Sequence, residues 1–183
     1  MKTQPSSRPV ITGILKSFCL LLILAACSDE PEVVPAQSDE GATNARRWNP
    51  DHPNYNLNVL LFAAQPRCFA LGFIKFRQNV DEPKVIHLDT KVLGLEPNTN
   101  YLLQRAVDTA LDGDCTSTAW LTLGAGLDPL PITTNNKGFG EAEIFRSVAA
   151  IASGTTFDIH FQIIKESTSE VVLTSDCYQY TVR

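Results

Sequence analysis

One stretch near the C-terminus decides the fold class: residues 155–165 read Thr-Thr-Phe-Asp-Ile-His-Phe-Gln-Ile-Ile-Lys. Apolar and polar residues alternate along it, with Phe157, Ile159, Phe161 and Ile163 in one set and Asp158, His160 and Gln162 in the other. Side chains of a β-strand point to its two faces in turn. The stretch therefore predicts a strand with one face in a hydrophobic core and the other in water.

Similar runs occur throughout residues 57–183, separated by residues that favour turns. We expect strands at 57–63, 68–78, 84–93, 100–107, 119–123, 140–147, 155–165 and 171–182. Asn135-Asn136-Lys137-Gly138 predicts a turn before the strand at 140–147, because Asn and Gly tolerate positive φ. The sequence shows no convincing helical stripe. Residues 57–183 are therefore predicted to form one all-β domain, a single antiparallel Greek-key β-sandwich of about eight strands.

The N-terminus has the layout of a secretory signal. Lys2, Arg8 and Lys16 are the only charged residues before Cys27, and a mostly apolar run at 17–26 follows them. This run is about half the roughly 20 residues that a membrane-spanning helix needs. Residues 1–26 are therefore predicted to be a cleaved signal peptide.

Leu24-Ala25-Ala26-Cys27 resembles the lipobox of bacterial lipoproteins. In that family the small residues fit the signal peptidase and the cysteine thiol carries a diacylglyceryl group. The resemblance implies that Cys27 is the lipid-carrying first residue of the mature protein and that the membrane is its partner. Two or three acyl chains would anchor the protein in the membrane almost permanently, since each buried methylene contributes about 0.8 kcal/mol. The alternative is an ordinary cleaved signal that happens to precede a cysteine.

Ser28-Asp29-Glu30, directly after that cysteine, resembles the acidic export signal of Bacteroidota surface lipoproteins. The resemblance implies that the protein is located on the outer face of the outer membrane. The serine also fits release from the inner membrane under the proteobacterial sorting rule, and a solvated tether whose acids have no sorting role is the other alternative. Residues 27–56 are rich in proline and acidic residues, so they predict a disordered tether.

The net charge of the mature chain narrows its possible functions. Without the three basic residues of the signal peptide, the formal net charge falls from −5 to −8. This balance argues against nucleic-acid binding, which needs clustered Lys and Arg.

Beside Cys27, the mature chain keeps Cys68, Cys115 and Cys177. An oxidising compartment favours pairing of two of them, and their spacing alone leaves all three pairings open.

Residues 95–101, Leu-Glu-Pro-Asn-Thr-Asn-Tyr, resemble the tyrosine corner of fibronectin type III domains. There the tyrosine hydroxyl ties a crossing between two sheets to the backbone, which implies an immunoglobulin-like sandwich. In that family the corner lies near the C-terminus, whereas more than 80 residues follow Tyr101 here. A different sandwich therefore accommodates the chain better.

Across roughly residues 57–183, the order of features resembles the Cu/Zn superoxide dismutase sandwich. The matching segments are the second strand at 72–78, the turn at 94–95, the disulfide segment at 112–117, the turn and strand at 136–142 and the last copper histidine at 157–160. Cys177 lies where that family has its second disulfide cysteine. The resemblance thus implies a superoxide dismutase-like fold and a disulfide between Cys115 and Cys177, with Cys68 left free.

The metal ligands of that family are missing. Leu102 and Gln104 stand at the positions of two copper histidines, and the shortened loop 116–130 contains no histidine. A copper site needs several imidazoles around one ion, and the domain has only His87 and His160. The resemblance therefore supports the fold, argues against dismutase activity, and predicts no metal or other cofactor.

The remaining candidate sites are interpreted structurally. His87 and His160 are expected to be surface histidines. Asp108, Asp112 and Asp114 carry the oxygen ligands that Ca²⁺ prefers, but their spacing does not match an EF-hand loop, and we interpret them as a solvated acidic loop. The GxSxG, Walker and HExxH motifs are absent from the sequence.

The segment Leu121–Pro131 is unusually apolar for a connection. It is either an exposed patch that docks a partner or a flap that closes one end of the sandwich, and we favour the flap. The leading functional hypothesis is a membrane-anchored lipoprotein of the cell envelope with a non-catalytic domain in a binding or structural role, with an envelope protein or a glycan as partner. The alternatives are a metal-dependent, dismutase-like enzyme and a surface adhesin or glycan-binding module.

Overall fold

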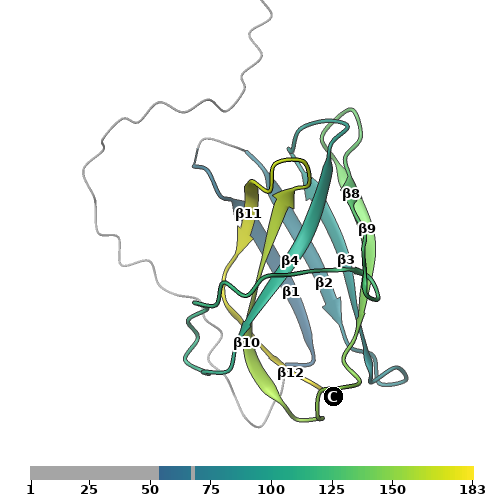
Figure 1. The fold of residues 1–183 in the computed structure, drawn as a ribbon, viewed down its shortest axis with the longest axis vertical. Coiled ribbons are helices and arrows are strands. Elements are labelled where there is room, and N and C mark those ends of the chain that lie inside the picture. The colour runs from purple at the N-terminus through teal and green to yellow at the C-terminus, as the bar shows by residue number, and fades with distance from the viewer. Residues whose placement is uncertain (1–53, 67–68) are drawn as a thin grey trace, which may run out of the picture. The chain divides into compact units, whose positions relative to one another are not determined.

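The structure is a computed structural model, and it describes residues 54–66 and 69–183. Within these ranges the chain forms β-strands and no helix, so the prediction of an all-β domain is confirmed (Figure 1). The predicted signal peptide, Cys27 and Cys68 lie outside the described residues, as does nearly all of the predicted tether.

Eight strands of four or more residues form the framework. They are β1 (Asn56–Ala63), β2 (Leu71–Arg77), β3 (Val85–Leu93), β4 (Asn100–Asp108), β9 (Gly140–Ser147), β10 (Thr156–Lys165), β11 (Val171–Ser175) and β12 (Tyr178–Thr181). Four strands of two residues each lie between β4 and β9: β5 (Leu121–Thr122), β6 (Gly124–Ala125), β7 (Asp128–Pro129) and β8 (Ile132–Thr133).

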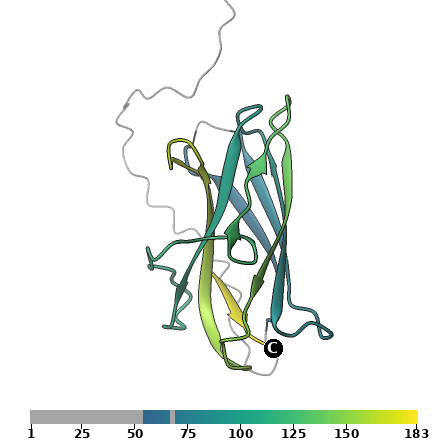
Figure 2. The same cartoon turned by 45° about the vertical axis from the view of Figure 1, so that its right-hand side comes forward.

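All twelve strands belong to one mixed sheet with the order β5-β4-β10-β11-β1-β2-β3-β9-β6-β7. In addition, β12 pairs with β10, and β8 pairs with β4. The pairs are antiparallel except that between β6 and β9. Figures 1 and 2 show the sheet curving so that the half with β4, β10 and β11 faces the half with β1, β2, β3 and β9. The sheet thereby nearly closes into a barrel.

The core fills the space between these two halves. Alternate residues of each strand point inward, as the period of two requires. Aromatic side chains from both halves meet there: the ring of Phe76 on β2 lies 6.3 Å from that of Phe161 on β10 and 4.7 Å from that of Tyr180 on β12. Leu61, Ile74, Leu103 and Ile163 are among its fully buried residues.

The strand predictions match closely, with three differences. The predicted strand at 171–182 is divided into β11 and β12, with Cys177 between them. The predicted strand at 119–123 is reduced to β5, and the three short strands that follow it were not predicted. The predicted turn is confirmed, since the Gly138 N–H donates to the Asn135 carbonyl at 3.0 Å.

The expectation that one face of β10 lies in water is wrong. Asp158 is 0% exposed and Gln162 only 7% exposed, although both lie on the predicted polar face. The loop after β4 accounts for the difference: Gly113 donates its N–H to Asp158 at 2.8 Å, and the Trp120 ring lies 4.6 Å from the ring of His160. Alternation places residues on two faces, but it does not tell whether a distant loop covers one of them.

The two ends of the curved sheet meet along a line between β4 and β9, which we call the seam. Residues 121–125 cross it, because β5 pairs with β4 and β6 pairs with β9. Figure 1 shows this bridging segment running across the front of the sheet at mid-height. The flap interpretation placed this segment at one end of the sandwich, whereas it crosses between the two edges of the sheet. Leu123 is buried in the core, and its N–H donates to the Leu103 carbonyl at 2.8 Å. Leu127, beyond the bridge, is exposed.

Candidate functional site

The inner face of β4 carries two polar side chains among its apolar ones. Tyr101, Leu103, Arg105 and Val107 share this face because they alternate along the strand. Tyr101 and Leu103 are buried in the core, whereas Arg105 is half-buried. The environments of Tyr101 and Arg105 differ. We therefore interpret Tyr101 as a structural residue and Arg105 as a candidate binding residue.

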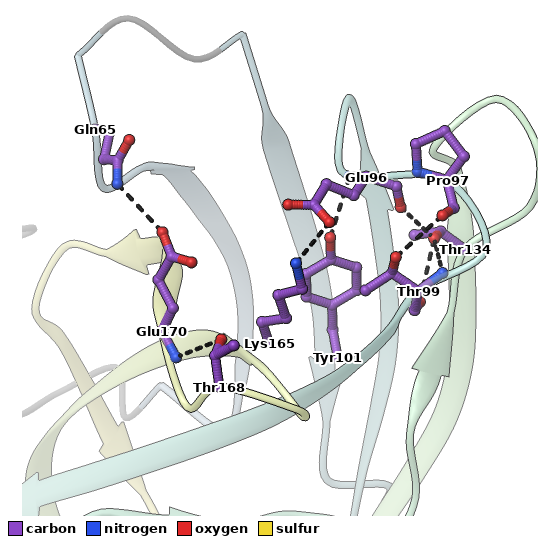
Figure 3. Close-up of polar contacts among 9 residues, drawn as sticks. All are labelled: Gln65, Glu96, Pro97, Thr99, Tyr101, Thr134, Lys165, Thr168 and Glu170. Atoms are coloured by element: carbon purple, nitrogen blue, oxygen red, sulfur yellow. Dashed lines mark hydrogen bonds and ion pairs between the residues drawn. The ribbon is translucent and has the colours of Figure 1, made fainter. Parts of the chain in front are cut away.

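Tyr101 lies at the beginning of β4. Together with Glu96, Thr99 and Thr134 it forms the region that we call the corner (Figure 3). Its hydroxyl accepts a hydrogen bond from the Glu96 N–H at 3.1 Å, as the resemblance to a tyrosine corner implies. Thr134 donates its hydroxyl proton to the Glu96 carbonyl at 2.6 Å and accepts the Thr99 N–H at 3.0 Å. The polar groups around the crossing from β3 to β4 are thus satisfied by one another.

An ion pair covers the corner from outside: Lys165 Nζ lies 2.6 Å from Glu96 Oε2. This hydrogen bond raises the pKa of Lys165 above its ordinary value. Burial raises the pKa of Tyr101, with a smaller opposing effect from the backbone N–H of Glu96. Both shifts favour the protonated form, so the phenol stays neutral and the amine stays charged up to a higher pH than usual.

The second region is a partly open cavity of about 220 Å³ inside the seam, which we call the seam pocket. Its apolar wall comes mainly from β3, β10 and the segment after β9, with Leu88, Phe157, Ile159, Val148 and Ile151 among the lining residues. Its charged groups are Arg105 and Arg146, and none of the lining residues is acidic.

The two arginines reach the pocket from opposite sides of the seam. Arg105 projects from β4 directly opposite Phe161 of β10, and Arg146 projects from β9. Arg146 Nη1 donates to the Gly126 carbonyl at 3.0 Å. Arg105 makes no side-chain hydrogen bond or ion pair with any described residue. Burial lowers the pKa of Arg105, and the like charge of Arg146 lowers it further. A half-buried cation without an acceptor favours binding of an anion.

Leu102 and Gln104, which the superoxide dismutase resemblance aligns with two copper histidines, lie on the outer face of β4. Gln104 accepts a hydrogen bond from Gln162 at 2.7 Å and donates one to the Thr122 hydroxyl at 3.0 Å. Its neighbour Leu102 is half-buried. This row of amide and hydroxyl groups joins β10, β4 and β5. Among residues 54–66 and 69–183, no group of three His, Cys, Asp or Glu is placed to hold a metal ion.

The expectation of a surface histidine is wrong for His160 and correct for His87. Besides the ring contact with Trp120, the His160 ring nitrogen lies 3.0 Å from the Ser117 carbonyl oxygen, so the ring is half-buried under the loop after β4. His87 points outward and pairs with Glu82 at 3.0 Å.

The acidic loop uses its carboxylates to hold its own backbone. Asp108 accepts the Ser117 N–H at 3.1 Å, and Asp112 accepts the Asp114 N–H at 3.0 Å. Asp112 and Asp114 are exposed, as predicted for a solvated loop, whereas Asp108 is half-buried. The structure does not bring the three aspartates together as a ligand set.

The disulfide links Cys115 and Cys177, with a Cα–Cα distance of 5.3 Å. This is the pairing that the superoxide dismutase resemblance implies. It ties the loop after β4 to the junction between β11 and β12. Gln179, two residues further on, donates to Asp158 at 3.2 Å.

Arg105 and Arg146 were not among the site residues predicted from the sequence. A signal was present for both. Arg105 is in phase with Tyr101 and Leu103, and Arg146 is in phase with Ile144. An arginine in the inward phase of a predicted strand breaks the binary pattern, and such breaks concentrate at functional sites.

Comparisons with known proteins give no relative from which to transfer a role. No protein-family model matches the sequence, and no curated protein matches it. No helix among the described residues is long and apolar enough to cross a membrane.

Proposed function

We propose that this chain is a membrane-anchored lipoprotein of the cell envelope whose non-catalytic domain binds a small ligand. The seam pocket is the observation that carries the binding role. It combines an apolar wall with two convergent charged groups, Arg105 and Arg146, in a concave site. That combination is typical of small-molecule sites, in which apolar surface supplies affinity and a few polar groups fix orientation.

The binding role is tested by closing the pocket. Ala150 is exposed and lines the pocket, so Ala150→Trp should fill the mouth while leaving the core intact. Ala149→Trp is the matched control, because Ala149 is also exposed but does not line the pocket. In a thermal-shift screen of neutral and charged small molecules, ligands should raise the Tm of the wild type and of Ala149→Trp but not that of Ala150→Trp. A screen in which both tryptophan variants respond like the wild type would contradict pocket binding.

The anchor is proposed at Cys27, with the domain held at the outer membrane and facing the cell surface. The lipobox and the acidic residues that follow it support this proposal. Cys27→Ala should abolish labelling of the protein by a fatty-acid analogue. Cys19→Ala is the matched control and should keep the label, because Cys19 lies within the predicted signal peptide. Digestion of the domain by protease in intact cells tests exposure at the surface, and protection would indicate the periplasmic face.

We further propose that the domain is a Greek-key sandwich of the superoxide dismutase-like kind without dismutase activity. The strand order supports the topology, because consecutive β3 and β4 lie in opposite halves of the sheet while β10, β11 and β1 separate β4 from β2. The amide row of Gln104 and Gln162 supports the lack of activity. Copper-loaded protein should show no dismutation above that of free copper. One tightly held copper per chain would favour the enzyme instead.

A second candidate function is a surface adhesin or glycan-binding module. Leu60, Phe62 and Phe73 are exposed on the outer face of β1 and β2, and Leu60 lies directly opposite Phe73. Exposed aromatic residues on a strand face are typical of interaction surfaces. Phe73→Asp should then abolish binding to a glycan array. Val80→Asp, at an exposed position outside the strands, should leave it unchanged.

A further inference from the structure

We propose that the ligand of the seam pocket is a small amphipathic carboxylate, an aromatic ring or short branched chain with one carboxylate that Arg105 holds. This inference rests on the proposed binding role and adds the chemical class of the ligand. Its basis is the position of the Arg105 guanidinium group beside a mostly apolar wall, in a pocket whose lining includes no acidic residue.

Arg105 is placed where a strand of this type normally carries an apolar residue. It follows Leu103 on the inner face of β4 and lies opposite Phe161. A guanidinium group carries five N–H donors, and no acceptor among the described residues binds those of Arg105. Partial removal of this cation from water is unfavourable without an acceptor. A carboxylate in the pocket would supply one, and its two oxygens match the guanidinium fork.

Arg146 strengthens the preference for an anion. Its Nη1 group is engaged with the Gly126 carbonyl, which fixes the side chain at the wall of the pocket. Its like charge acts on Arg105 across the seam. Because the lining includes no acidic residue, this repulsion is not compensated within the pocket. A bound monoanion would face two cations and would relieve the repulsion between them.

The volume and the apolar wall define the rest of the ligand. An engineered apolar cavity of about 150 Å³ admits benzene, so the seam pocket of about 220 Å³ has room for one ring with a carboxylate. Phe157 and Ile159 of β10 and Leu88 of β3 offer the apolar contacts. A bare inorganic anion would leave this wall without a partner, and a neutral apolar molecule would leave Arg105 without one.

Isothermal titration calorimetry with three probes tests the inference on the full chain, held in lipid nanodiscs, with empty nanodiscs as the blank. Sodium benzoate combines ring and carboxylate, benzyl alcohol keeps the ring without the charge, and sodium sulfate has the charge without the ring. We expect benzoate to bind at least tenfold more tightly than either of the others. Thermal shift with the same probes provides a second readout.

Variants assign the effect to Arg105. Arg105→Leu should weaken benzoate binding by about tenfold to a hundredfold, the range expected for loss of a charged hydrogen bond. Arg105→Lys should keep part of the affinity, because it retains the charge without the fork. Lys75→Gln is the matched control: it removes one positive charge from the exposed face of β2, away from the pocket, and should leave benzoate binding unchanged.

The outcomes separate the ligand class from the binding role. Equal binding of benzyl alcohol and benzoate, unaffected by Arg105→Leu, would overturn the carboxylate inference and leave pocket binding standing. Sulfate bound as tightly as benzoate would also overturn it, in favour of an inorganic anion. If benzoate does not bind at all, the inference is overturned, and the Ala150→Trp screen then decides separately whether the pocket binds anything.

Discussion

Tyr101 and Arg105 point to the same side of the same strand, four residues apart, yet the protein treats them in opposite ways. Around Tyr101 the chain supplies the partner for each polar group, from the Glu96 N–H to the Thr134 hydroxyl. Around Arg105 it supplies apolar side chains and a second arginine. A satisfied inward polar group stabilises a fold, whereas an unsatisfied one has a cost that a ligand can offset. The corner is therefore structural, and the seam pocket is the candidate binding site.

The largest expected effect comes from the disulfide, which ties the loop after β4 to the junction between β11 and β12. Cys115 and Cys177 are 62 residues apart, and closing a loop of that length stabilises by about 4 kcal/mol in the chain-entropy model. Cys177→Ala should therefore lower the Tm by roughly 10 °C or more, measured by circular dichroism. Cys68→Ala is the matched control and should have a much smaller effect. An unchanged Tm in Cys177→Ala would contradict a structural role for the bond.

Removal of the Tyr101 hydroxyl, the central acceptor of the corner, should have the next largest effect on stability. Tyr101→Phe keeps the ring but leaves the Glu96 N–H without its partner, so it should lower the free energy of unfolding by about 1–2 kcal/mol in urea denaturation. Tyr55→Phe is the control, because it removes a half-buried hydroxyl outside the corner and should change stability by less than about 0.5 kcal/mol. If both variants behave alike, the corner hydrogen bond does not stabilise the fold.

Removing the polar group of Arg105 should change the free energy of unfolding in the opposite direction. Arg105→Leu removes a half-buried cation and its repulsion with Arg146. We expect the free energy of unfolding to stay the same or to rise by up to about 1 kcal/mol. Arg77→Leu provides the contrast and should destabilise, because the Arg77 guanidinium donates to the carbonyls of Leu57 and Phe76 at 2.7 Å. Marked destabilisation by Arg105→Leu would show that Arg105 has a structural role.

The all-β class and the positions of the long strands were predictable because their signals are local. Alternating residues located the long strands, and the turn at 135–138 followed from the conformational freedom of Asn and Gly. The burial of Asp158 was not predictable, because the loop that covers it comes from a segment more than 40 residues away, at Gly113. A period of two reports on the strand itself and carries no information about what covers it.

The candidate site was less predictable, because it depends on two strands that are far apart in the sequence. Arg105 and Arg146 each break the apolar pattern of their own strand, and that much was visible. Their approach across the seam depends on the curvature of the sheet and on the bridging segment, which sequence patterns do not specify. The disulfide pairing followed from family resemblance alone, since the spacing left three pairings open.

The smallest expected effect is the pH dependence of the corner. The folded-state pKa of Lys165 is raised by its hydrogen bond with Glu96, so its contribution is complete below about pH 10 and is lost as the pH rises through the folded-state pKa. Burial raises the pKa of Tyr101, which acts in the same direction. Stability should therefore fall in the alkaline range above pH 10, and the ion pair's share is small because Glu96 is exposed.

Lys165→Met tests this share in urea denaturation between pH 8 and pH 11. The variant should lose stability less steeply above pH 10 than the wild type does, because the folded state no longer retains that proton. Lys91→Met is the matched control: the pair of Lys91 with Glu141 is longer, at 3.4 Å, and more exposed. Its alkaline slope should stay close to that of the wild type. Equal slopes in the wild type and Lys165→Met would mean that the ion pair covers the corner without stabilising it, and that the neutral hydrogen bonds beneath it suffice to hold Tyr101 in place.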